Sequence, residues 1–196
     1  MADKKTIDDL FSFKDRRSLV RRNYNGNISL GDYPDLPVFK PDNSYKTVSI
    51  VIGPDEDAFS YLPKITEICT KGKHTGKQEK FLTAVYEAFR NAYQHGNKRD
   101  PAKKIHLSYR IGNDFFEVVV SDEGREMLAD FIPFVMMHQV GLDTACSFYE
   151  FSDAKEKLDE NSGIGTFIIH YSSDEVKYFK NEFGGLSIAL KIKARK

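Results

Sequence analysis

The segment from Glu87 to Gly96 constrains the fold of this chain more than any other part of its sequence. It places a carboxylate, a carboxamide and an imidazole at four-residue intervals, at Glu87, Asn91 and His95. Residues with this spacing share one face of an α-helix. The other positions around the helix are mostly apolar, so the pattern predicts a largely buried helix over about 76–95 with one polar stripe.

The polar stripe needs a polar partner, because burying Glu87 and Asn91 without one would be costly. A metal ion, a bound ligand or another polar side chain would each meet that need, and the stripe alone does not distinguish them. Gly96 is expected to end the helix by taking the left-handed conformation that glycine adopts without strain.

The overall composition excludes several classes of protein. The chain has 196 residues, a formal net charge of zero and two cysteines, Cys69 and Cys146, without metal-ligand spacing. This length suits one domain with an appendage, and the balanced charge predicts no direct nucleic-acid binding. No apolar segment is long enough to span a membrane, and the N-terminus lacks a signal-peptide core. We therefore expect a cytoplasmic protein with reduced thiols and no membrane attachment.

Residues 1–44 differ in character from the rest. They contain a basic stretch at 14–22 and then turn-rich sequence with three prolines. Two interpretations remain open: a partly ordered extension that packs on the domain surface, which we favour, and an arm that binds a partner.

Hydrophobic periodicity defines the elements of the remaining domain. Alternating apolar residues predict a first strand and then two hairpins, with strands at 45–52, 105–111, 115–121, 175–180 and 186–192. A helix is predicted over about 57–70, capped by Asp55 or Asp57. The long connection at 125–162 contains two segments with helical character, at 131–138 and 148–158. The pattern predicts an α+β sandwich, with a mixed, mostly antiparallel sheet and helices on one face.

Two further motifs follow the polar-striped helix. Asp122-Glu-Gly124 ends an apolar strand, and Gly163-Ile-Gly165-Thr166 opens a short apolar helix. A carboxylate at a strand end suits recognition of an exocyclic amine, and glycines at a helix N-terminus expose backbone amides that attract phosphate. Each motif alone is also typical of an ordinary turn or helix start.

The order of these motifs resembles the GHKL ATPase superfamily, which includes gyrase, MutL and histidine kinases. Within it, Asn91-Ala-x-x-His95-Gly96 looks most like the anti-sigma-factor serine/threonine-protein kinases of the RsbW/SpoIIAB type. The resemblance covers about residues 45–194. It implies a Bergerat-type sandwich for the domain at 45–196, with a lid at about 125–162.

The resemblance also implies roles for the helix residues. Asn91 would hold the Mg²⁺ ion that bridges the triphosphate of ATP. Glu87 would be the base that accepts a proton from a protein serine, although a buried glutamate paired with Arg90 or a lysine is the alternative. His95 is expected to have a structural role at the helix end.

The two glycine motifs would surround the nucleotide. Asp122 would bind adenine N6, and Gly124 would let the backbone approach the base closely. Gly163, Gly165 and Thr166 would surround the phosphates at the helix N-terminus.

The function implied is that of an ATP-dependent serine kinase and anti-sigma-type regulator of transcription. Such a protein binds a sigma-factor-like subunit, phosphorylates an antagonist protein and usually acts as a homodimer. The alternative is a non-catalytic interaction module on the same fold. It is favoured by Glu126, which stands where the family usually has the second glycine of Asp-x-Gly-x-Gly, and by the long, apolar lid segment. A detached histidine-kinase catalytic domain fits the His-Gly ending less well.

Overall fold

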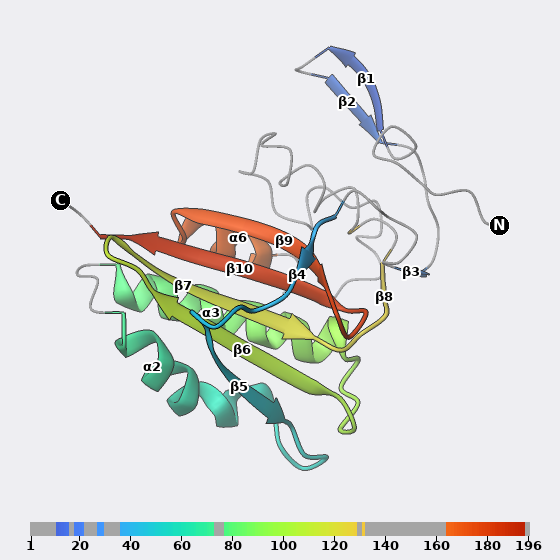
Figure 1. Cartoon of the computed structure of the whole chain (residues 1–196). Helices are drawn as coiled ribbons and strands as arrows, with labels where there is room; N and C mark the ends of the chain where they lie inside the picture. The colour runs from blue at the N-terminus through green and yellow to red at the C-terminus, as the bar shows by residue number, and fades with distance from the viewer. Residues whose placement is uncertain are drawn as a thin grey trace.

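The computed structural model describes residues 11–15, 18–21, 27–29, 36–72, 77–128, 131 and 164–194, and only the backbone for the strands before residue 36 and at 126–128. Its main feature is a curled six-stranded sheet (Figure 1). In spatial order the strands are β4 (Val38–Phe39), β9 (Glu175–Asn181), β10 (Leu186–Lys193), β7 (Phe115–Asp122), β6 (Lys104–Ile111) and β5 (Lys46–Val51). All neighbours are antiparallel except β4 and β9.

The helices cover one face of this sheet, behind it in the view of Figure 1. They are η2 (Ala58–Tyr61), α2 (Leu62–Thr70), α3 (Gln78–Asn91), the π-helical turn η3 (Ala92–Gly96) and α6 (Ile164–Tyr171). Asp57 caps the first of them, since its side chain accepts a hydrogen bond from the Ser60 backbone N–H at 3.1 Å. The predicted α+β sandwich is therefore confirmed.

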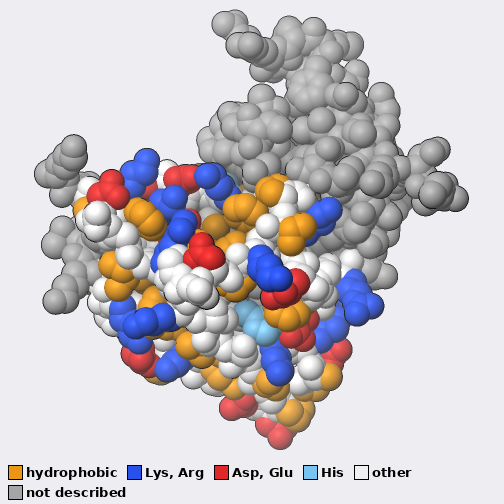
Figure 2. Space-filling view, in the orientation of Figure 1, with side chains coloured by type: hydrophobic (Ala, Val, Ile, Leu, Met, Phe, Trp, Pro, Cys, Tyr) orange, Lys and Arg blue, Asp and Glu red, His pale blue; other side chains and the backbone are white. Residues whose placement is uncertain are grey.

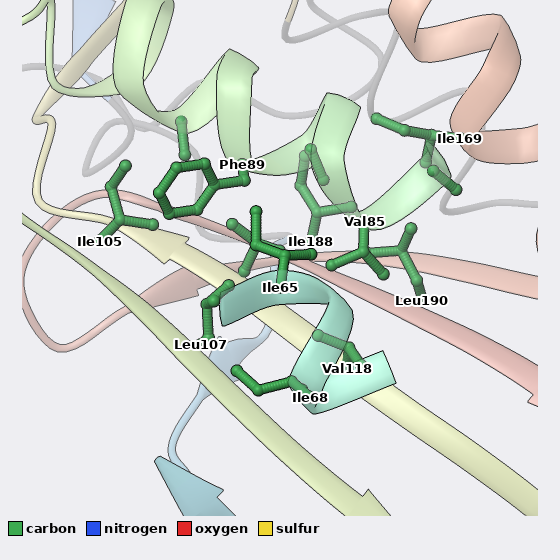
Figure 3. Close-up of a cluster of buried hydrophobic side chains, with 14 of the residues drawn as sticks. Ile65, Ile68, Val85, Phe89, Ile105, Leu107, Val118, Ile169, Ile188 and Leu190 are labelled. Carbon is green, nitrogen blue, oxygen red and sulfur yellow. The ribbon is translucent and has the colours of Figure 1, made fainter. Parts of the chain in front are cut away.

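The hydrophobic core lies between the helices and the sheet (Figure 3). Helix α2 contributes Ile65 and Ile68, and α3 contributes Val85 and Phe89, all of them fully buried. The sheet meets them with side chains from alternate positions, which share one face of a strand. These include Ile105, Leu107, Val118, Ile188 and Leu190. The same alternation puts Asp122 on the helix-facing side of β7, two residues beyond Val120.

The opposite face of the sheet carries many charged side chains. Figure 2 shows acidic and basic side chains interspersed over it. Glu117 lies at the centre of one cluster, where it accepts hydrogen bonds from the Tyr45 hydroxyl at 2.6 Å and from Arg110 Nε at 2.5 Å. Within the described residues, no helix has the length and apolar character needed to cross a membrane.

The first 44 residues contribute several described strands. β1 (Phe11–Asp15) and β2 (Ser18–Arg21) form a hairpin, and β3 (Asn27–Ser29) pairs with β8 (Glu126–Leu128). Leu36 is 1% exposed and belongs to the core. The segment before β5 thus contacts both the sheet and the connection that follows β7.

The prediction that Gly96 takes the left-handed conformation is wrong. Positive φ occurs instead at the described residues Lys98, at 55°, and Arg99, at 59°, in the loop directly after this helix. Regular α-helix ends at Asn91, and the predicted remainder of the helix is the wider π turn. The structure also puts Gly165 inside the first turn of α6 rather than before it.

Parts of the predicted lid lie outside the described residues. The helical segments expected at 131–138 and 148–158 are among them, apart from Phe131, which packs against the core. Cys146 and Gly163 also lie outside the described residues. Cys69 is a buried free thiol, and its burial raises the pKa of that thiol to about 12.

Candidate functional site

Asp122 is a buried carboxylate at the end of β7, only 5% exposed. Its Oδ1 accepts hydrogen bonds from the backbone N–H groups of Gly124, at 2.9 Å, and Leu186, at 3.2 Å. Its backbone carbonyl accepts a third hydrogen bond from Asn181 Nδ2 at 2.8 Å. These contacts come from the turn after β7 and from both strands of the last hairpin, so they fix the orientation of the carboxylate.

Glycines surround this carboxylate because there is no space for side chains. A Cβ atom on Gly96 would lie 2.4 Å from Asp122 Cγ, and one on Gly185 would lie 2.2 Å from the Asp122 carbonyl oxygen. A Cβ on Gly124 would lie 2.0 Å from the carbonyl oxygen of Gly96. The end of the π turn, the Asp-x-Gly segment and the last hairpin therefore meet at Asp122.

Burial raises the pKa of Asp122 from 3.8 to about 7. The hydrogen bonds from Leu186 and Gly124 and the charge of Lys103 oppose this increase without cancelling it. Because its pKa is raised, this carboxyl group can become neutral, and a neutral group costs less free energy to desolvate when a ligand N–H group binds to it.

Glu87 lies on the polar stripe of α3 and is 8% exposed. Arg90 Nη2 is 2.7 Å from Glu87 Oε2, but the two are not aligned as a hydrogen bond. Burial raises the pKa of Glu87, and the Arg90 charge partly offsets that increase. The structure therefore contains the Glu87–Arg90 ion pair that was the alternative interpretation of this glutamate. The Oε2 atom of Glu87 nevertheless has no hydrogen bond.

Helix α6 brings its first turn against this stripe. A Cβ atom on Gly165 would lie 2.6 Å from Glu87 Oε2 and 3.6 Å from Asn91 Nδ2. Thr166, the next residue, is buried. The structure thus brings Glu87, Asn91 and Gly165 together, although α3 and α6 are far apart in the sequence.

The site therefore has two ends along one helix. Glu87, Asn91 and Gly165 form one end, and Asp122 and Gly124 form the other, around the Gly96 end of the π turn. The π turn closes with a hydrogen bond from the Asn97 N–H to the Ala92 carbonyl at 2.7 Å. π-helical turns are rare and occur frequently at functional sites.

Two residues at the Asp122 end were missed by sequence reasoning. Asn181 and Gly185 belong to the last hairpin, which the sequence identifies only as a strand pair with a turn. Asn181 also accepts hydrogen bonds at Oδ1 from the N–H groups of Phe183 and Gly185. A single asparagine at a strand end gives no sequence signal that separates it from an ordinary turn residue.

The described part of the chain shows no protein cage for a metal built from ionisable side chains. Among the described residues, no group of three or more His, Cys, Asp or Glu side chains could hold a metal ion. Mg²⁺ usually keeps several waters and is bound through one or two protein ligands and the substrate's phosphates. The neutral Asn91 amide beside the Gly165 backbone fits that manner of binding.

The comparison with known families agrees with this geometry. A family model described as histidine kinase-like ATPase domain matches residues 65–192, about two thirds of the chain. The matched range contains α3, the Asp-x-Gly segment, the start of α6 and the last hairpin. A search of curated proteins found no significant match. The chain therefore belongs to the histidine kinase-like ATPase domain family, and ATP binding is the activity that follows from that membership.

Proposed function

We propose that this chain is a Mg-ATP-dependent serine/threonine-protein kinase and an anti-sigma-type regulator that binds and phosphorylates a protein antagonist. The observation that carries the proposal is the contact of the Glu87 carboxylate with Gly165, one helical turn from Asn91. This close approach brings the proposed base and the proposed metal-binding amide to the first turn of α6, while Asp122 lies at the other end of the site. A sigma-factor-like subunit is the second partner, and a homodimer is the proposed assembly.

In this proposal the two ends of the site hold the two ends of ATP. Asp122 accepts a hydrogen bond from the exocyclic amine of adenine, and Gly124 keeps the space beside the base open. Asn91 would hold Mg²⁺, which when bound neutralises phosphate charge and orients the triphosphate. The backbone at Gly163 and Gly165 and the Thr166 hydroxyl would contact the phosphates.

Glu87 accepts the proton of the attacking serine hydroxyl. Its raised pKa makes it a stronger base than an exposed glutamate, and burial beside Gly165 fixes its position. Arg90 lies on the same carboxylate and keeps it partly neutralised before the substrate arrives. The γ-phosphoryl group would then form a bond to the serine oxygen as its bond to the β-phosphate oxygen breaks and ADP leaves. The protein's part in such a transfer is to position these two oxygens.

The second candidate is a non-catalytic interaction module, and one observation favours it. Residues 126–128 form β8, whose backbone pairs with β3. The family usually has a glycine at the position of Glu126, where a lid would begin to move. A strand pairing at that position holds the start of the lid segment against residues 27–29.

Glu87→Gln and Asn91→Ala test the two proposals together. Glu87→Gln keeps the size of the side chain, so Mg-ATP should bind within about twofold of the wild type, while label transfer from γ-labelled ATP to a library of serine peptides falls by at least about 100-fold. Asn91→Ala should weaken binding of Mg-ATP more than binding of ATP in the presence of a chelator.

Three results would change the conclusion. Label transfer by Glu87→Gln at the wild-type rate would remove the base assignment. ATP binding by the wild type without any label transfer would favour the non-catalytic module. Equal effects of Asn91→Ala with and without Mg²⁺ would remove the metal-binding role of Asn91.

A further inference from the structure

A cavity lies at the Asp122 end of the site. It has a volume of about 220 Å³ and is lined by Gly96, Lys98, Lys103 and Arg125. We call it the basic cavity. The pairing of Ile105 with Asp122 puts it where β6 begins and β7 ends, at the opposite end of the π turn from Asn91 (Figure 1).

Lys98 and Lys103 lie on the loop between the π turn and β6. Asn97, which is 1% exposed, anchors this loop. Asn97 Nδ2 donates a hydrogen bond to the Lys104 carbonyl at 2.9 Å, and Oδ1 accepts one from the Glu123 N–H at 2.8 Å. The Arg99 N–H donates to the Tyr93 carbonyl at 2.9 Å. The loop is thus tied to the π turn, to β6 and to the residue after Asp122.

The backbone of this loop is strained at two consecutive positions. Lys98 and Arg99 have φ values of 55° and 59°, in the left-handed region that side-chain-bearing residues seldom adopt. Strain of this kind persists only where surrounding contacts impose it, and it is concentrated at binding and active sites. The Asn97 contacts impose it here, and they hold Lys98 at the edge of the basic cavity.

Arg125, the third cationic residue of the cavity, comes from the segment that follows β7. The stem of Arg125 lies against the turn of the last hairpin, where a Cβ on Gly184 would be 3.4 Å from Arg125 Cγ. The basic cavity therefore collects two ammonium groups and one guanidinium from two separate segments of the chain.

Two acidic residues among those described, Glu123 and Asp122, lie next to the cavity-lining segments and have other contacts. Glu123 is occupied with other partners, since Oε1 lies 2.9 Å from His106 Nε2 and Oε2 accepts the Lys104 N–H at 3.1 Å. Asp122 is 5% exposed, and Gly96 packs on its carboxylate. Within the part of the chain that the structure describes, the cavity is lined by one glycine and three cationic side chains.

The size and charge of the cavity define the class of ligand. Pockets for drug-sized ligands are larger, roughly 300–1,000 Å³, so a volume of about 220 Å³ suits a compact anion. Phosphate oxygens accept charge-assisted hydrogen bonds from ammonium and guanidinium groups, and guanidinium matches phosphate geometry especially well. We propose that the basic cavity binds a compact phosphate-class anion, at a position separate from Asn91 and Gly165. This binding does not depend on whether the chain is a kinase.

Titration of pyrophosphate into the full chain, in a chelator and at low ionic strength, tests the proposal by calorimetry. Lys103→Gln should weaken binding by at least about tenfold, the loss expected when one charge-assisted hydrogen bond is removed. Lys104→Gln is the matched control, because it removes the same charge from the neighbouring residue, which does not line the cavity. It should change the affinity by less than about twofold through screened electrostatics.

Arg125→Gln should weaken pyrophosphate binding as Lys103→Gln does, and it lies on a different segment, so a local folding defect would not explain both. Asn91→Ala should leave pyrophosphate binding unchanged. Competition with ATP and with adenosine identifies the source of the phosphate: displacement by ATP alone assigns it to a nucleotide, and displacement by neither assigns it to a free anion.

Three results would overturn the proposal. The first is no heat of pyrophosphate binding at millimolar concentration. The second is an equal loss for Lys103→Gln and Lys104→Gln, which would indicate a diffuse charge effect. The third is loss of binding in Asn91→Ala, which would assign the anion to the other end of the site.

Discussion

Gly165 lies so close to Glu87 that a methyl group on the glycine would stand 2.6 Å from Oε2 of the glutamate. The contact joins the first turn of α6 to the polar stripe of α3. It leaves the carboxylate no space to turn toward α6, and it brings the buried Gly165 close to both Glu87 and Asn91. The position of Glu87 therefore depends on the absence of a side chain on a different helix.

Gly165→Ala should displace the Glu87 carboxylate and separate α6 from α3. We expect the free energy of unfolding to fall by about 1–3 kcal/mol, as for other insertions of one carbon into a tightly packed contact, and ATP binding to weaken with it. Urea denaturation and calorimetric titration of Mg-ATP measure the two effects. Gly53→Ala is the control, because its Cβ would meet only the flexible Glu56 side chain, at 3.2 Å. Equal changes in unfolding free energy and Mg-ATP affinity for the two variants would show that the Gly165–Glu87 contact does not fix the carboxylate.

Asp122 should make stability depend on pH. Its pKa of about 7 in the folded protein is above the ordinary value of 3.8, so the folded state holds the proton more tightly than the unfolded state. The stabilisation from the protonated form is complete below about pH 3.8 and is lost as the pH rises through about 7. Asp122→Asn has no proton to release here, so the wild type should lose stability relative to this variant between about pH 4 and 7. Parallel urea midpoints across that range would contradict the prediction.

Asp122→Asn should also change the preference among nucleotide bases. Oδ1 already accepts the N–H groups of Gly124 and Leu186, so the asparagine should keep its oxygen there and turn its amide nitrogen toward the ligand. An amide N–H repels the exocyclic amine of adenine and suits the carbonyl of guanine. We expect ADP to bind at least about tenfold more weakly and the ratio of ADP to GDP affinity to fall. An unchanged ratio in calorimetric titrations would remove Asp122 from base recognition.

Arg99→Gly should stabilise the protein, because glycine adopts a φ of 59° without the steric cost that arginine bears there. We expect the free energy of unfolding to rise by roughly 1 kcal/mol. Arg99→Ala removes the same side chain beyond Cβ but keeps the strain, so it should give no such increase. A comparison of the two variants by chemical denaturation separates the backbone effect from the loss of charge. A more stable alanine variant would attribute the effect to charge.

The sequence predicts the elements of this fold well where a local pattern encodes them. Alternating apolar residues predict the strands β6 and β7. The four-residue spacing of Glu87 and Asn91 predicts that both lie on one face of α3. Asp57 as a helix cap is also a local signal and is confirmed.

Contacts between distant segments were not readable in this way. Asn181 and Asp122 are 59 residues apart, and their hydrogen bond depends on the registers of β10 with both β7 and β9. Gly96 was identified as a required glycine for the wrong reason: its φ is ordinary, but the Asp122 side chain fills the space beside it. The left-handed Lys98 and Arg99 were not foreseen because neither residue favours that conformation; the anchoring of Asn97 imposes it.

The pairing of β4 with β9 and the burial of Leu36 have a practical consequence for anyone who shortens this protein. A chain that started at residue 45 would contain the whole alternating pattern of the later strands. Such a chain would lack β4, so β9 would become an unpaired edge strand, and the loss of Leu36 would leave a cavity in the core. Unpaired edge strands promote aggregation of β-proteins. Recombinant production of the domain should therefore keep the residues from Leu36 onward.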